Sequence, residues 1–282
     1  MTLRASTGST RADQVVADVV EAYASRLPGA VRGVYVAGSY AEGLPVPASD
    51  IDVVAVLRED ADQELAREIA TACASSSPIR LDLVPVTTAG LAAGFLAFVP
   101  SFKYGTLLVH GEDVRDELLL PSLDAFAAAW AERGRRFMAR IRRSDTISVP
   151  LEYPDPDGEF YGYDRATITE WYPPGTMQST KELVAIVGSA ATALVALQGG
   201  AYVSSRGKCA ALYAEYVDDE WTDVVRQVHA LCRERFHYMI PEAQLDRATL
   251  RGLASQVLAF EQHALIAFGQ SGPKRPGPAK AP

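Results

Sequence analysis

Residues 34–56 read VYVAGSYAEGLPVPASDIDVVAV, and this stretch decides the fold of the first part of the chain. A β-rich apolar run ends at Gly38-Ser39, and a polar turn leads to Asp50, Asp52 and a second apolar run. Side chains two apart in a strand point to the same face, so we expect the two carboxylates side by side. Carboxylates that close repel each other unless a cation lies between them. The pattern therefore predicts a cation site at the end of a strand.

The neighbouring turn indicates which cation. Oxygen ligands beside a Gly-Ser turn suit Mg²⁺ that carries a nucleoside triphosphate. Each dipeptide alone is common in ordinary turns, so the order and spacing carry the argument. Gly38-Ser39, three residues, Gly43, and then Ser-Asp-Ile-Asp resembles the signature of the DNA polymerase β-like nucleotidyltransferase superfamily. The resemblance implies Mg²⁺, two ions by expectation, and ATP or another nucleoside triphosphate as co-substrate.

A third carboxylate follows on the next predicted strand. Residues 79–86, IRLDLVPV, place Arg80 and Asp82 on one face. An exposed edge strand would also account for Asp82. In the resembled superfamily, however, a third acid occupies this strand. The resemblance therefore implies that Asp50, Asp52 and Asp82 are the catalytic and metal-binding residues, with Asp82 either a general base or a metal ligand only.

Composition narrows the function classes. The 282 residues contain 48% hydrophobic and 22% charged residues, enough for one large core or two ordinary ones. The net charge of −8 argues against nucleic acid as a partner and is compatible with a cationic small molecule. No signal segment and no run of eighteen apolar residues is visible, so we expect a soluble, cytoplasmic protein without a membrane partner.

The cysteines indicate neither disulfides nor a metal site. Three cysteines far apart in the sequence give no disulfide framework. Cys209, His229, Cys232 and His237 match no familiar zinc spacing and fall in helical runs, so we expect them to be core residues.

The periodicities predict two domains. Residues 1–120 form the first domain, with a disordered start over 1–9, a helix over 11–27 capped by Thr10, a helix over 59–75 and an extended run over 102–111. The resemblance implies that this is the nucleotidyltransferase domain, which binds metal and nucleotide. Residues 121–270 form a helical substrate-binding domain, and 271–282 form a disordered tail. The fold class is α+β: a small mixed sheet followed by an all-helical bundle.

The second half contains one irregular, acidic region. Residues 144–176 include LEYPDPDGEFYGYD, in which aromatic rings and carboxylates could line a pocket for a polyamine or amino sugar. A Pro-rich surface loop without a ligand is the alternative. The substrate-binding candidates are Glu152, Tyr153, Asp155, Asp157, Glu159 and Trp171.

The order of the two domains resembles the aminoglycoside nucleotidyltransferases, as does YVSSRGK at residues 202–208, a predicted loop. In that group a lysine after the central helix, here the buried run over 180–197, contacts the triphosphate. The resemblance assigns this role to Lys208 with Arg206 beside it, and phosphate binding to Gly38 and Ser39. An ordinary cationic loop at a helix start is the alternative.

We therefore predict Mg²⁺-dependent transfer of a nucleoside monophosphate, AMP by preference, to a hydroxyl of a small cationic acceptor such as an aminoglycoside, with release of pyrophosphate and antibiotic resistance as the outcome. The acceptor could instead be a non-antibiotic biosynthetic intermediate or a protein hydroxyl. A catalytically silent nucleotide-binding regulator is a further alternative. A polymerase would need a basic groove that the chain offers little of. A homodimer is possible, and the sequence does not decide it.

Overall fold

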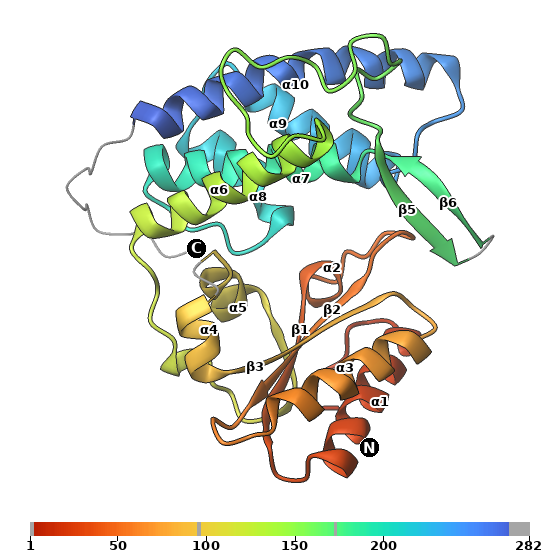
Figure 1. Ribbon diagram of the computed structural model, residues 1–282, viewed down its shortest axis with the longest axis vertical. Coiled ribbons are helices and arrows are strands. Elements are labelled where there is room, and N and C mark those ends of the chain that lie inside the picture. The colour runs from red at the N-terminus through yellow and green to blue at the C-terminus, as the bar shows by residue number, and fades with distance from the viewer. Residues whose placement is uncertain (1–2, 95–96, 172–173, 271–282) are drawn as a thin grey trace. The chain divides into compact units, whose positions relative to one another are not determined.

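The computed structural model describes residues 3–94, 97–171 and 174–270 (Figure 1). The chain forms two compact units, Met1–Pro121 and Ser122–Pro282. The first contains a four-stranded mixed sheet and the second is largely helical, which confirms the predicted fold class. The predicted tail over 271–282 lies outside the described residues.

The sheet of the first unit has the strand order β3-β2-β1-β4. Strand β1 (Val31–Ala37) pairs antiparallel with β2 (Ile51–Leu57) and with β4 (Leu107–Gly111). Strand β3 (Leu81–Thr87) runs parallel to β2. A parallel neighbour requires a crossover, which α3 (Gln63–Ser76) supplies after its N-cap, Asp62.

Helices cover both faces of this sheet (Figure 1). Val34 and Val36 pack with α1 (Thr10–Arg26) and α3 in one core. Tyr35, which points the other way, packs with α4 (Thr88–Gly94) and α5 (Val99–Gly105) in a second core. The period-two alternation of the strands thus sorts their side chains between two helical layers.

The start of the chain differs from the expectation. Residues 3–9 were predicted to be disordered, but the Arg4 backbone N–H donates to the Val109 carbonyl at 2.8 Å. The Thr7 backbone N–H and hydroxyl both donate to Asp13 at 2.8 Å. Ser9, not Thr10, caps α1, because its hydroxyl accepts from the backbone N–H of Ala12. Hydrogen bonds to α1 and β4 order this short polar segment.

The run over 102–111 is only partly extended. Phe102 belongs to α5, and β4 begins at Leu107. Pro100 lies in the first turn of α5, where a missing N–H costs no hydrogen bond. The buried Phe102 ring contacts Tyr35 with a centroid distance of 4.6 Å, so burial against the sheet favours the helix here.

The second unit is built around α7 (Lys181–Leu194), which continues as a π-helix over Val195–Gly199. Its other helices are α6 (Leu123–Ile141), α8 (Arg206–Tyr216), α9 (Thr222–Gln227), a π-helix over Val228–Arg235, and α10 (Gln244–Gln270). The span Lys181–Gly199 is long and apolar enough to cross a membrane by length and composition, with a mean hydropathy of 1.6. However, 72% of that window is buried inside the protein, as in a core helix.

A two-stranded hairpin corrects the expectation of an all-helical second unit. Strands β5 (Ala166–Trp171) and β6 (Pro174–Ser179) pair antiparallel within the region expected to be irregular. The alternating ATITEW sequence suits a strand, whereas Pro174 opens β6, where a missing N–H is tolerated. The loop before the hairpin is also ordered, because the Asp155 backbone N–H donates to the Tyr161 carbonyl at 3.0 Å.

A buried ion pair links the end of α6 to α10. The guanidinium of Arg142 donates to the Glu261 carboxylate at 2.5 Å, and the Tyr163 hydroxyl donates to the same carboxylate at 2.7 Å. The Glu261 side chain is fully buried and that of Arg142 is 11% exposed. Burial raises the pKa of Glu261, and the bonds from Arg142 and Tyr163 oppose that rise. The pair therefore depends on both partners being present.

Candidate active site

The adjacent ends of three strands bring together two of the three predicted carboxylates. Asp52 lies opposite Ala37 in β1 and beside Asp82 in the parallel strand β3. Neighbouring strands are about 4.8 Å apart, and residues in register point to the same face. Asp52 is half-buried and Asp82 is exposed. Their carboxylates therefore lie on one face of the sheet, at the edge formed by the ends of the strands.

Asp50 lies immediately before β2, next to this pair. The Ile51 backbone N–H donates to the Arg80 carbonyl at 2.8 Å, which brings the residues before β2 beside those before β3. One carboxylate oxygen of Asp50 lies 3.9 Å from Nε of Arg80. The structure thus gathers Asp50, Asp52 and Asp82 at the start of two parallel strands.

Gly38 brings the backbone directly against this edge. It follows β1, has a φ of +63°, and begins the short helix α2 (Gly38–Ala41). A Cβ atom at Gly38 would clash with Oδ2 of Asp52. Glycine is required here for both the left-handed backbone and the close approach. Ser39, next in the chain, is half-buried, and its carbonyl accepts from the backbone N–H of Leu44 at 2.9 Å.

The charge of Asp50 affects the pKa of Tyr40. Burial raises the pKa of Tyr40 in α2, and the Asp50 carboxylate raises it further, whereas Arg11 lowers it. The Tyr40 hydroxyl therefore stays protonated at physiological pH.

The donor set fits a hard divalent cation. Carboxylate oxygens are the ligands that Mg²⁺ takes, and Asp50, Asp52 and Asp82 lie at the same end of neighbouring strands, beside a glycine that leaves room for Asp52. Within the described ranges, no group of three or more His, Cys, Asp or Glu side chains is close enough to hold a metal ion. The assignment of Asp50, Asp52 and Asp82 as a joint metal set therefore stays a prediction, which rests on their shared edge and their chemistry.

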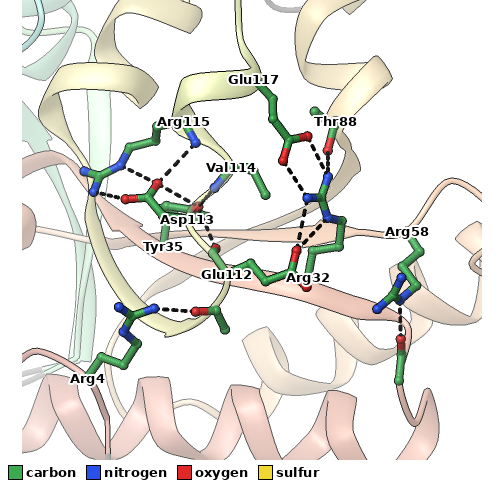
Figure 2. Close-up of polar contacts among 12 residues, drawn as sticks. Arg4, Arg32, Tyr35, Arg58, Thr88, Glu112, Asp113, Val114, Arg115 and Glu117 are labelled. Atoms are coloured by element: carbon green, nitrogen blue, oxygen red, sulfur yellow. Dashed lines mark hydrogen bonds and ion pairs between the residues drawn. The ribbon is translucent and has the colours of Figure 1, made fainter.

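The segment after β4 is fixed to β1 by Arg32, as Figure 2 shows. The Arg32 guanidinium donates to Glu117 at 2.6 Å, to Glu112 at 3.1 Å and to the Thr88 hydroxyl at 3.1 Å. Arg32 joins β1 to α4 and to the segment after β4. These bonds help to hold β1, the strand that ends at Gly38, in position.

Tyr35 also holds this segment (Figure 2). Its hydroxyl donates to the Glu112 carbonyl at 3.0 Å and accepts from the Val114 backbone N–H at 2.7 Å. Burial raises the pKa of Tyr35 to about 12. The guanidinium of Arg115 donates to Asp113 at 2.8 Å through Nε and lowers the pKa of Asp113 to about 2. Both groups therefore keep one protonation state over the neutral range.

Arg206 and Lys208, the predicted phosphate ligands of the second unit, are not in a loop. They lie in the first turn of α8, which Ser205 caps by accepting from the Lys208 backbone N–H at 3.3 Å. The Ser-Ser pair supplied this signal, since serine is a preferred N-cap. Lys208 is exposed, and the Arg206 side chain lies outside the described part of the structure.

Two of the four acids expected to line an acceptor pocket already have arginine partners. Asp155 pairs with Arg165 at 2.9 Å, and Glu159 pairs with Arg247, whose Nε donates at 2.8 Å. Arg247 is distant in sequence and comes from α10, so no local pattern revealed it. Of the other candidates, Glu152 and Asp157 are exposed, Tyr153 is half-buried, and the side chain of Trp171 is not among those described.

Tyr153 and the loop around it are fastened to α10. The Tyr153 hydroxyl donates to the Ser255 carbonyl at 3.0 Å, and its ring stacks on Tyr161 with a centroid distance of 4.4 Å. The Arg251 guanidinium lies 5.7 Å from the centre of the Tyr161 ring. This side of the loop packs against its own unit.

The cysteines of the second unit are core residues, as expected. Cys209 and Cys232 are buried, and burial raises the pKa of their thiols to about 11 and about 12. A metal ligand must be a thiolate, so these neutral thiols suit packing better than zinc.

Comparisons with known proteins agree with this geometry. Residues 16–102, which span β1, α2, β2, α3 and β3, match the family model of the nucleotidyltransferase domain. The first unit therefore contains a nucleotidyltransferase domain of the polymerase β-like kind, and this domain supports a nucleotidyltransferase enzyme.

Two kinds of solved structure are similar to the chain, one over most of its length and one over about a third of it. The spectinomycin adenyltransferase AAD(9) from Enterococcus faecialis, solved with ATP and spectinomycin, is 12% identical, with a TM-score of 0.48 over 86% of this chain and 99% of that one. A toxin–antitoxin structure with AMP-PNP is 22% identical, with a TM-score of 0.29 over 36% of this chain and 77% of that one. No curated protein matches the chain.

Proposed function

We propose that this nucleotidyltransferase transfers AMP from ATP, in the presence of Mg²⁺, to a hydroxyl of a small cationic acceptor and releases pyrophosphate. The observation that carries the proposal is the register of Asp52 beside Asp82, with Asp50 and the backbone of Gly38 at the same edge. Carboxylates grouped in this way serve an enzyme that binds a metal–triphosphate complex better than one that binds a neutral ligand.

In this proposal each residue has a distinct role. Asp50 and Asp52 hold the metal, which when bound neutralises phosphate charge and lowers the pKa of the acceptor hydroxyl. Asp82 takes part in holding the metal or accepts the hydroxyl proton. The backbone after Gly38, together with Ser39, binds the β- and γ-phosphates, because glycine permits a close approach.

Two classes of acceptor are compatible with the proposed reaction. A small cation requires carboxylates able to pair with ammonium groups, and Asp155 and Glu159 are engaged by Arg165 and Arg247. Glu152 and Asp157 are the exposed acids of the same loop. The engaged pairs favour, as second candidate, a protein hydroxyl or a small molecule without several amino groups.

One experiment separates these candidates. The purified chain is incubated with each labelled nucleoside triphosphate, Mg²⁺ and a panel of aminoglycosides, and the products are analysed by mass. We expect an adduct of AMP with at least one aminoglycoside and release of pyrophosphate. An adduct on a protein substrate, with none on the panel, would transfer the proposal to the second candidate. Absence of any pyrophosphate release with every triphosphate would refute the enzymatic proposal.

A further inference from the structure

Arg80 occupies the same edge as the proposed metal ligands, and nothing above gives it a role. In the paired strands, Asp52 lies beside Asp82 and Ile51 beside Leu81. One step further toward the start of the strands, Arg80 comes beside Asp50, and Nε of Arg80 lies 3.9 Å from Oδ2 of Asp50. A guanidinium therefore lies against the first of the three carboxylates.

The contact between Arg80 and Asp50 is weak and easily broken. Its length of 3.9 Å exceeds that of a hydrogen bond, and the Arg80 side chain is 57% exposed. Exposed pairs of this kind contribute little to stability. The ion pair of Arg142 with Glu261, at 2.5 Å and fully buried at the carboxylate, shows what a permanent pair looks like in this chain. Arg80 is instead an exchangeable partner of Asp50.

A positive charge at this position affects a divalent cation directly. A guanidinium a few ångströms from a metal site repels the metal, since Coulomb interactions at such distances are appreciable even near the surface. A triphosphate that arrives with the metal changes the balance, because arginine binds phosphate oxygens in charge-assisted hydrogen bonds. The same side chain opposes the bare metal and favours the metal–nucleotide complex.

We propose that Arg80 is a resident counter-ion of the carboxylate edge, which competes with the divalent metal for Asp50 and moves to the phosphates when metal and triphosphate bind together. The proposal rests on the proposed function. It makes metal and nucleotide binding cooperative: the metal alone binds weakly, and each ligand strengthens the other by the same factor.

The test measures Mn²⁺ binding to the full chain by electron paramagnetic resonance, with and without a non-hydrolysable ATP analogue. In Arg80→Gln, we expect Mn²⁺ alone to bind about 3- to 10-fold more tightly than in the wild type, because the competing charge is gone. The strengthening of Mn²⁺ binding by the analogue should shrink. A purely structural role of Arg80 would weaken metal binding, so a gain of affinity distinguishes the two.

Arg58→Gln is the matched control. Arg58 follows the other end of β2, about 26 Å from Asp50 at 3.3 Å per residue, and donates to the Gly29 carbonyl at 2.9 Å (Figure 2). It removes the same charge and should leave Mn²⁺ binding unchanged. Equal or weaker affinity in Arg80→Gln, or the same gain in Arg58→Gln, would overturn the proposal alone. A wild-type chain that binds Mn²⁺ under neither condition would overturn the proposed function and this proposal with it.

Discussion

Two acidic regions of this chain look alike in sequence and differ in structure. At the strand edge, Asp82 is exposed beside the half-buried Asp52 and a glycine backbone. In the loop before the hairpin, Asp155 and Glu159 are paired with arginines. Acids paired one by one with arginines stabilise the loop, whereas acids that lie side by side at the strand ends are the arrangement on which the proposed metal site rests.

The largest effect is expected when one carboxylate in each region is replaced by an amide. Asp52→Asn should lower the rate of nucleotidyl transfer by about 1,000-fold without lowering the midpoint of urea denaturation, since it removes charge from the proposed reacting centre. Asp155→Asn should keep the rate and lower stability by roughly 0.5–1 kcal/mol. Steady-state kinetics and urea denaturation of both variants measure this contrast. Near-normal turnover in Asp52→Asn would remove the strand edge from catalysis.

The next prediction compares a buried ion pair with an exposed one by the stability that each contributes. Glu261→Gln leaves the buried Arg142 guanidinium without its counter-charge, so we expect a loss of about 3–5 kcal/mol in unfolding free energy. Glu159→Gln removes an exposed pair and should cost at most about 1 kcal/mol. Urea denaturation of the two variants gives both values. Equal losses would mean that burial does not distinguish these pairs.

A third comparison tests the close approach at the site. Gly38→Ala introduces a Cβ that clashes with Asp52, and we expect transfer to fall roughly 10- to 100-fold, as when a supporting contact of a metal site is lost. Gly43→Ala is the control: its φ is +71°, so the backbone strain is similar, but its Cβ would meet nothing within 4 Å. If both variants lost the same activity, strain rather than the contact would be responsible.

The smallest effect depends on pH. Arg115 lowers the pKa of Asp113 from 3.8 to about 2 in the folded state, so the folded chain favours the ionised form. The stabilisation is complete above the unfolded pKa, near 4, and is lost as the pH falls through about 2. Because Asp113 is 42% exposed, it amounts to only about 0.5–1 kcal/mol. The gap in urea stability between the wild type and Asp113→Asn should therefore close from pH 6 to pH 2, and a constant gap would contradict the ion pair.

The parts of the fold that follow from local patterns were predictable. Alternation along residues 34–37 and 53–57 gives two strands with two faces, and the structure uses both faces. The Gly38-Ser39 turn and the spacing of Asp50 and Asp52 depend only on neighbours in sequence. The ends of elements were less accurate, as the cap at Ser9 instead of Thr10 shows.

The parts that depend on distant residues were not predictable. The partner of Glu159 is Arg247 in α10, and no pattern within the loop indicates that its charge is already neutralised. The hairpin β5–β6 was obscured by its prolines, which local rules count against strands. Likewise the sequence predicted that Arg80 and Asp82 share one face of a strand. That Arg80 also lies near Asp50 follows only from the register of β2 with β3 in the structure.

The apolar segment at the centre of the second unit has a consequence for handling the protein. Lys181–Gly199 is as hydrophobic as a membrane span, and burial in the native state keeps it from water. Once heat opens this unit, the segment becomes a strong driver of association between chains, and aggregation competes with refolding. We therefore expect thermal transitions to depend on scan rate and protein concentration, so that urea titrations, rather than melts, give its equilibrium stability.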